Sequence, residues 1–265
     1  MTTTPILDVS GLRKLFNGHV VPDSVDLTVP PSSVVSVLGR SGTGKSVLLK
    51  CLTGLLMPDA GEVRFAGRRL GSTSESYADF RRRSRFLFQG NALFDALNAL
   101  ENVALPLEQT TTISALEITQ RARAALRRLG LGLSENEYPG QMSGGMQKRL
   151  ALARALVSVP ELVLFDEPTA GLDPLTRNAV FAMIARQSRE SGFTAVIVTH
   201  DVLEALAVSD HIALLDQGRV RFQGTPAQFL TTDTPQVQTL RQNTAGLSAP
   251  LTVAHRHETA SQHSL

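Results

Sequence analysis

VVSVLGRSGTGKSVLLKCL, residues 34–52, joins a short β-branched run to a longer apolar run through a glycine-rich octapeptide. The octapeptide GRSGTGKS, residues 39–46, has the spacing G-x-x-x-x-G-K-[ST] between a predicted strand and a predicted helix, which is the context that a phosphate-binding loop needs. Its glycines let consecutive backbone N–H groups turn inward around phosphate oxygens, at the positive end of a helix dipole. An ordinary glycine-rich turn is the alternative, but it requires neither the strand nor the helix.

This loop predicts a set of nucleotide-binding residues. Lys45 is expected to reach the β- and γ-phosphates, and the Ser46 hydroxyl is expected to bind Mg²⁺. The full set runs through the loop into the helix: Gly39, Arg40, Ser41, Gly42, Thr43, Gly44, Lys45, Ser46 and Val47.

A second motif, LVLFDEPTAGLDP at residues 162–174, follows another predicted buried strand. Asp166 is at the carboxyl end of that strand, where open α/β sheets present ligands, and is expected to hold the Mg²⁺ water shell. Glu167 comes next and is expected to act as the general base that polarises the attacking water. Two acidic residues after a strand are often only a solvated turn, and the phosphate loop in the same chain favours the catalytic interpretation.

Polar residues at the ends of other strands suit the same pocket. Gln89, at the end of FLFQ, is expected to touch the metal and the water and to act as a hinge. His200, at the end of TAVIVTH, is expected to donate to the γ-phosphate, although a single strand-end histidine is often structural. Phe16 is a candidate to stack on adenine, with plain core packing as its alternative.

Short buried strands alternate with helical segments along the chain, which predicts a mostly parallel sheet covered by helices. The strands are expected at 34–39, 86–90, 162–167, 194–200 and 211–220. Earlier alternating segments, LDVSGLRKLF, VDLTVP and GEVRFAG, predict a flanking antiparallel sheet. No strand pattern is present from about 91 to 158, so a helical subdomain is expected there. After Leu230 the composition becomes polar, and roughly the last 15 residues are expected to be mobile.

Composition limits the function classes. The 265 residues carry a net charge of +2, which does not favour nucleic acid as a partner. No apolar run approaches the roughly 20 residues that cross a bilayer, and MTTTP does not resemble a signal peptide, so membrane contact is expected through a partner. The single cysteine, Cys51, is expected to be a small buried hydrophobe. The basic run at 81–85 is interpreted as a solvated face, and HRH at 255–257 as a weak metal candidate.

GRSGTGKS, FQ, MSGGMQ, LFDE, GLD and TH occur in the order and spacing of ABC-transporter ATPase subunits, and the resemblance covers nearly all of residues 5–230. It implies an α/β fold: a RecA-like P-loop core with a mostly parallel sheet, a flanking antiparallel β-subdomain and an inserted α-helical subdomain. The expected domains are an ABC ATPase domain at 1–230, with the helical subdomain at about 91–158, and a partly disordered C-terminal extension at 231–265. The implied cofactors are ATP and Mg²⁺.

The resemblance also implies a head-to-tail dimer with a second copy of the chain. Ser143 and the bare N–H groups of Gly144 and Gly145 would then close over the γ-phosphate bound by the partner's phosphate loop. Met146 stands where the family more often has glutamine, and Gln147 follows it; the backbone cap would be unaffected. By the same resemblance, Asp173 in GLD is expected to lie along the interface between the two copies, called here the dimer seam.

The sequence around the motifs is similar to that of MCE- or Mla-type bacterial phospholipid-transport ATPases. The similarity is most evident in GKSVLLK, LFQGNALFDALNALENVALPL and the tail DTPQVQTLRQNTAGL. The resemblance implies contact with integral membrane permease subunits through the region after Gln89, at Ala92, Leu93, Phe94 and Asp95. Leu93, Phe94 and Leu97 have core packing as their alternative. Further partners would be an MCE-domain or substrate-binding protein and a small regulatory subunit, at the cytoplasmic face of the inner membrane.

Other classes compete with lipid transport. The ATPase of an amino-acid or other small-solute importer would have the same catalytic residues. ABC ATPases that act on nucleic acid usually have two cassettes in one chain or a long coiled-coil insertion, and this sequence has neither. A stand-alone P-loop kinase would not need residues 143–145.

Overall fold

The computed structural model describes residues 4–16, 19–71 and 74–244. The central sheet has the strand order β12-β11-β5-β10-β9-β8. Five of its strands are parallel: β5 (Val34–Leu38), β8 (Ser84–Leu87), β9 (Leu162–Asp166), β10 (Thr194–Thr199) and β11 (His211–Asp216). The sixth, β12 (Arg219–Gly224), runs antiparallel to β11. The predicted mostly parallel sheet is therefore confirmed.

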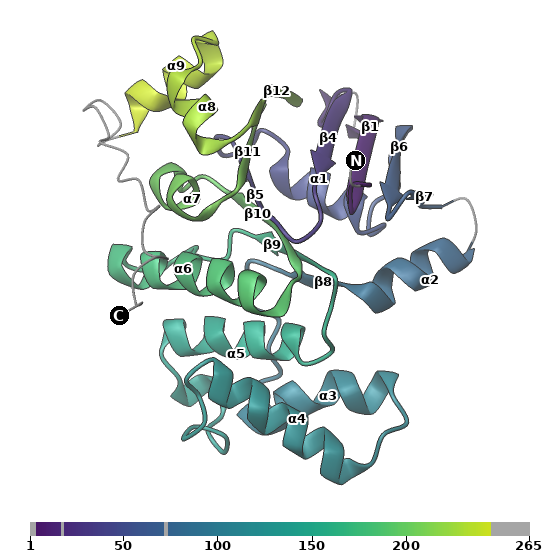
Figure 1. The fold of residues 1–265 in the computed structure, drawn as a ribbon, viewed down its shortest axis with the longest axis vertical. Coiled ribbons are helices and arrows are strands. Elements are labelled where there is room, and N and C mark those ends of the chain that lie inside the picture. The colour runs from purple at the N-terminus through teal and green to yellow at the C-terminus, as the bar shows by residue number, and fades with distance from the viewer. Residues whose placement is uncertain (1–3, 17–18, 72–73, 245–265) are drawn as a thin grey trace, which may run out of the picture.

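A four-stranded antiparallel sheet flanks the central one, as predicted, with the order β4-β1-β6-β7. Its strands are β1 (Leu7–Arg13), β4 (Val25–Val29), β6 (Ala60–Phe65) and β7 (Arg68–Arg69). A short ladder of β2 (Leu15–Phe16) and β3 (His19–Val20) lies apart from both sheets. Figure 1 shows this antiparallel part on the right, beside α1 (Lys45–Leu52) and α2 (Ser74–Arg83).

Residues 91–158 contain α3 (Ala99–Thr110), α4 (Ala115–Arg128), a 3₁₀ turn (Pro139–Gln141) and α5 (Gly144–Leu156). In Figure 1, α3 and α4 form the lower end of the molecule, and α5 separates them from α6 (Pro174–Ser191). The remaining helices follow the last sheet strands: α7 (Val202–Val208), α8 (Pro226–Thr231) and α9 (Pro235–Asn243). The helical subdomain expected from the sequence thus corresponds to α3, α4 and α5.

The central sheet separates two apolar cores, because alternate residues of each buried strand face opposite sides. In β9, Val163 and Phe165 belong to the core that contains α5 and α6, whereas Leu162 and Leu164 belong to the core that contains α1 and the antiparallel sheet. All five residues of β9 are buried. The near-continuous apolarity of the strand reflects this burial on both faces.

Several predicted boundaries are wrong. The run 211–220 is a hairpin of β11 and β12, because Gln217 and Gly218 both take positive φ and form a tight turn. Strand β8 begins earlier than predicted and ends at Leu87, so residues 88–90 lie beyond it. The basic run at 81–85 is not simply a solvated face. It ends α2 and starts β8, and Arg83 forms bidentate hydrogen bonds to Glu161.

The C-terminal segment is helical up to Asn243, and Val237 of α9 is fully buried against the larger core. The predicted mobility of the last 15 residues, and the HRH sequence, lie outside the described residues. Cys51 is buried, as predicted, and burial raises the pKa of its thiol to about 11. Among the described residues no helix has the length and apolarity to cross a bilayer.

Candidate nucleotide-binding site

The phosphate loop connects β5 to α1, and contacts with neighbouring segments explain why two of its positions are glycine. Gly44 has φ +97°, and a Cβ there would lie 2.3 Å from Val21 Cγ1. A Cβ on Gly39 would lie 2.5 Å from the Leu215 carbonyl oxygen. Positive φ and contacts this short exclude any other residue without a backbone shift. The loop is therefore shaped by neighbours from β11 and from the segment before β4.

Lys45 begins α1, and its side chain is buried. Its Nζ donates to the carbonyl oxygens of Gly39 at 2.7 Å and Arg40 at 3.1 Å, and lies 3.6 Å from Glu167 Oε1. Burial lowers the pKa of the Lys45 ammonium, and the nearby Glu167 carboxylate opposes that effect. The ammonium is thus held inside the loop, beside the carboxylate predicted as general base.

Ser46 and Asp166 come together as predicted, since the Ser46 hydroxyl donates to Asp166 Oδ1 at 2.9 Å. Asp166 is buried, and burial raises the pKa of its carboxyl group. Within the described part of the chain, no group of three or more His, Cys, Asp or Glu side chains is arranged to hold a metal ion. A hydroxyl and one carboxylate fit Mg²⁺, which usually takes one or two protein oxygens and completes its shell with phosphate oxygens and water.

Glu167 has φ +46°, in the left-handed region that costs a non-glycine residue about 1–3 kcal/mol. Its N–H donates to the Val198 carbonyl oxygen at 2.9 Å, which fixes this backbone against β10. The Oε2 atom lies 2.9 Å from Nδ1 of His200, which is 55% exposed. The strained backbone turns the carboxylate towards both His200 and Lys45.

Gln89 is the predicted residue that the structure does not bring into this cluster. It lies two residues beyond the end of β8, is exposed, and its side chain forms no hydrogen bond with any described residue. Its carbonyl oxygen accepts from Lys148 Nζ at 3.1 Å, which ties the segment to α5. Leu87 lies opposite Phe165 in the ladder, so Gln89 follows the same sheet edge as Asp166 and Glu167. Its metal contact stays a prediction.

Phe16 ends the short strand β2 and is 40% exposed. The core-packing alternative is therefore wrong. Lys14 Nζ lies 5.8 Å from the Phe16 ring centroid, so one cation already approaches the ring. An exposed aromatic ring is available for stacking on a planar base.

The Ser143–Gly145 segment starts α5. Ser143 is the N-cap, and its Oγ accepts from the Met146 N–H at 3.3 Å. Gly144 and Gly145 also have a role within their own chain. A Cβ on Gly145 would lie 3.0 Å from Thr176 Cγ2, and one on Gly144 would lie 3.3 Å from Leu172 Cδ2. Sequence reasoning missed this close approach of α5 to α6 and to the segment just before it, which involves residues about 30 positions away.

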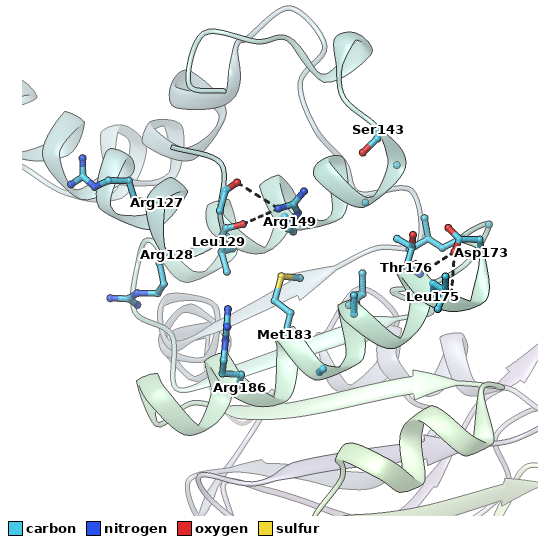
Figure 2. A pocket seen from close by; sticks show the side chains of 18 residues that line it. Arg127, Arg128, Leu129, Ser143, Arg149, Asp173, Leu175, Thr176, Met183 and Arg186 are labelled. Carbon is cyan, nitrogen blue, oxygen red and sulfur yellow. Dashed lines mark hydrogen bonds between the residues drawn. The ribbon is translucent and has the colours of Figure 1, made fainter. Parts of the chain in front are cut away.

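These residues line one end of a groove of about 1030 Å³ between α4, α5 and α6 (Figure 2). Asp173 lies at the same end, while Arg127, Arg128 and Arg186 line the other. None of residues 39–47 lines this groove. The groove that the glycines at the start of α5 line is therefore not the place where the phosphate loop lies.

The side chains of Met146 and Gln147 form contacts within their own chain. Gln147 Nε2 donates to the Pro139 carbonyl oxygen at 2.9 Å, which holds the preceding 3₁₀ turn. Met146 packs against the larger core. The expected contact with a partner's nucleotide thus rests on the backbone of Gly144 and Gly145 and on Ser143.

Asp173 is the N-cap of α6, and its Oδ1 accepts from the N–H groups of Leu175 and Thr176. Hydrogen bonds from Thr176 lower the pKa of the Asp173 carboxyl group. Its predicted place on a dimer seam is compatible with its exposure. Sequence reasoning also missed Asn102, a buried amide that binds the Phe94 and Leu97 carbonyls and shapes the loop after Gln89.

A family model described as "ABC transporter" matches residues 22–170. The chain belongs to the ABC transporter family. MlaF of Escherichia coli strain K12, an intermembrane phospholipid transport system ATP-binding protein, is 34% identical over 88% of this chain and 87% of its own length. SsuB of Burkholderia ambifaria, an aliphatic sulfonates import ATP-binding protein, is 42% identical over 80% of this chain and 61% of its own. A probable ribonucleotide transport ATP-binding protein, mkl of Mycobacterium tuberculosis, is 38% identical over 88% and 65%.

Solved structures of other ABC proteins have the same fold. The chain superposes with a TM-score of 0.79 on cbiO1 from Clostridium perfringens, part of an ABC transporter complex, at 26% identity over 91% of this chain and 96% of that one. A dimeric ATP-binding cassette solved with ADP and Pi gives a TM-score of 0.73 at 31% identity, over 83% and 98%. This ABC protein has the RecA-like P-loop fold, and it is an ATP-binding subunit that hydrolyses ATP with Mg²⁺.

Proposed function

We propose that two copies of this ABC subunit bind ATP head to tail and hydrolyse it to power transport by an integral membrane permease. In this proposal each ATP site is composite, with one group of residues from each copy. The observation that supports it is that these two groups lie apart within one chain. The phosphate loop, Asp166, Glu167 and His200 form one cluster, while Ser143–Gly145 line a groove that contains none of residues 39–47. A second copy would supply the missing half of each site.

The proposed chemistry follows from the contacts of the first cluster. Ser46 and Asp166 would hold Mg²⁺, which neutralises charge on the phosphate oxygens. Lys45 would bind the β- and γ-phosphates, and Glu167, held 2.9 Å from His200, would accept a proton from the attacking water. His200 would contact the γ-phosphate through the ring edge that does not face Glu167. The N–H groups at the start of α5 would close the site from the partner.

Replacing the general base tests this assignment. We expect Glu167→Gln in the purified chain to lower kcat by about 10²–10⁴-fold, the loss typical of a general base, while ATP affinity changes little. Lys45→Ala is the matched control, because it should weaken ATP binding itself. Steady-state hydrolysis and fluorescent-nucleotide titration separate the two effects. Normal turnover of Glu167→Gln would remove Glu167 from this role.

We further propose that the cargo is a phospholipid or another hydrophobic molecule. The support is the similarity to MlaF over nearly the full length of both chains. The higher identity to SsuB, over a smaller part of that relative, favours a small-solute importer as the alternative. Purifying the chain with its native partners and identifying bound molecules by mass spectrometry distinguishes them. Co-purified phospholipid supports lipid transport, whereas a binding protein loaded with a small solute contradicts it.

The permease contact is proposed at a second groove, of about 880 Å³, beside β8 and α3. Phe94 is 50% exposed and lines it, whereas Leu93 packs against the core. The described lining contains no Asp or Glu but five arginines: Arg81, Arg82, Arg85, Arg121 and Arg154. Burial lowers the pKa of Arg154, and its Nη1 is buried without a hydrogen-bond partner among the described residues. An apolar segment that carries a carboxylate would fit this groove.

This placement would hold the subunit at the cytoplasmic face of the inner membrane. An MCE-domain or substrate-binding protein and a small regulatory subunit stay predicted further partners, and the similarity to MlaF, an ATP-binding protein of an intermembrane phospholipid transport system, is compatible with them. The modest net charge of +2 argues against nucleic acid as a partner.

A further inference from the structure

Asp201 follows His200 directly and is a buried carboxylate that the proposed chemistry does not use. Its Oδ2 accepts from Thr169 Oγ1 at 2.7 Å, and its Oδ1 accepts from Arg177 Nη1 at 2.9 Å. Its N–H donates to Thr199 Oγ1 at 3.0 Å. Three elements therefore meet at this one side chain: the end of β10, the segment after β9 and the first turns of α6.

The position of Asp201 makes these contacts unusual. Asp201 is the N-cap of α7, a place where an aspartate normally accepts from the first N–H groups of the helix. Here its side chain forms no capping hydrogen bond and is directed to Thr169 and Arg177 instead. The usual capping hydrogen bond is thus given up for contacts across the site.

The contacts close a ring around the proposed general base. Glu167 and Thr169 are separated by one residue, Thr169 binds Asp201, Asp201 adjoins His200, and His200 Nδ1 lies 2.9 Å from Glu167 Oε2. Arg177 fixes the other carboxylate oxygen from α6, whose N-cap is Asp173. A displacement of the segment 168–173 would therefore be transmitted to His200.

We propose that Asp201 is a positioning residue, which holds His200 against Glu167 and couples this pair to the segment that carries Asp173. Closure of the groove at Asp173 by a second copy would then bring His200 into place for hydrolysis. This inference rests on the proposed roles of Glu167 and His200. It assigns to Thr169 and Arg177 a function that depends on His200.

The test removes one hydrogen bond and asks whether the loss depends on His200. Thr169→Val keeps the shape of the side chain but removes the donor to Asp201. We expect kcat to fall about tenfold, as for the loss of a hydrogen bond to a charged group, with KM for ATP changed less than about threefold. Thr169→Ser restores the hydroxyl and should restore most of kcat. Single-turnover hydrolysis of radiolabelled ATP by the full chain extends the measurement to slow variants.

The deciding comparison is a double-mutant cycle. In a His200→Ala background, Thr169→Val should lower kcat by less than about twofold, because the residue that it positions is gone. The same loss as in the wild type would overturn the proposal and leave Thr169 with a structural role. If His200→Ala alone kept full kcat, the proposed role of His200 itself would fail, and the inference with it.

Two further variants guard against an effect on folding. Ser188→Ala removes a buried hydroxyl that donates to the Phe193 carbonyl at 2.6 Å near the far end of α6, and should destabilise the chain without changing kcat. Arg177→Met removes the ion pair that Asp201 forms with α6, and should show the same dependence on His200 if Thr169→Val does not fold. Independence from His200 in that variant would equally contradict the proposal.

Discussion

Asp166 is a buried carboxylate whose charge makes the ligand-free protein less stable. Burial raises the pKa of its carboxyl group, and the hydrogen bond from Ser46 only partly opposes this. Because the folded-state pKa is raised, the protonated form favours folding, and stability is lost as pH rises from the unfolded value through the folded one. If Asp166 holds Mg²⁺ as proposed, that role is kept at the cost of stability, as is common for functional residues.

Asp166→Asn should therefore stabilise the ligand-free chain at pH 7 and abolish Mg²⁺-dependent hydrolysis. The amide is neutral and can still accept from Ser46. The gain in Tm should disappear below about pH 4, where aspartate is protonated in both the folded and the unfolded states. Thermal unfolding at both pH values checks this. A variant with a lower Tm than wild type at pH 7 would contradict the assigned cost.

The chemistry of single residues was easier to predict than their surroundings. The pattern around Lys45 and Ser46 predicts a phosphate loop because that motif depends on local geometry. The contact between Gly44 and Val21 depends on a distant segment, and so does that between Gly145 and Thr176. Asp201 was missed because an aspartate after a strand-end histidine has no distinctive spacing; only the fold brings Thr169 and Arg177 to it.

Helix α5 links the two surfaces that matter for coupling. Its first turn carries the glycines that face one groove, and Arg154, three turns later, faces the arginine-rich groove. Lys148, between them, binds the Gln89 carbonyl oxygen. A permease bound near Phe94 would thus act on the same helix whose first turn we propose to contact the partner's nucleotide. Arg154 lies 5.5 Å from the Phe94 ring centroid.

Arg154→Met tests the role of this helix in coupling. In the isolated chain the change should be neutral or stabilising, because it removes a partly buried guanidinium that has no acidic partner among the described residues. In the assembled transporter it should weaken permease binding by about 10–100-fold, the loss expected for a charge-assisted hydrogen bond worth about 1.5–3 kcal/mol. Co-purification with the permease and permease-stimulated hydrolysis are the measurements.

The matched control is Arg127→Met on α4, which lines the other groove and should leave permease binding unchanged. Equal losses in both variants would show that the effect is not specific to the arginine-rich groove. Unchanged permease binding by Arg154→Met would remove Arg154 from the interface.

At the level of helices and strands, the sequence predicted the type of element better than its ends. Val34–Leu38 and Leu162–Asp166 match expectation closely, because strands buried on both faces are continuously apolar. The run 211–220 was predicted as one strand, and this was wrong because the turn at Gln217 and Gly218 interrupts an otherwise uniform pattern. Helix α2 was missed because its mostly polar sequence, SESYADFRRR, contains few apolar residues.

In the whole molecule, the residues proposed to bind the nucleotide are not among the lining of the groove that contains the residues proposed to close over it. Its phosphate loop, Asp166 and Glu167 lie at the carboxyl edge of the central sheet, and Ser143–Gly145 lie beyond α6, at the groove shown in Figure 2. The order of the motifs predicts the family, and the family resemblance implies this separation; its structural cause is the insertion of α3, α4 and α5 between β8 and β9. A second copy is the partner of matching chemistry.

Defined mixed dimers test this arrangement most directly. Two changes are used: Lys45→Ala, which disables the phosphate loop, and Gly144→Asp, which places a carboxylate against a γ-phosphate yet suits the first turn of a helix. In the first mixed dimer each subunit carries one change. In the second, one subunit carries both and its partner is wild type. ATPase activity is measured after tandem purification through two tags.

If each nucleotide is bound between the loop of one subunit and the glycines of the other, the first dimer keeps one intact site and the second keeps none. The account predicts that the first dimer has about half of the wild-type ATPase activity, because one of its two sites is intact, and that the second dimer has almost none. The reverse order, with activity only in the second dimer, would show that both halves of the site come from one chain and would contradict the central claim.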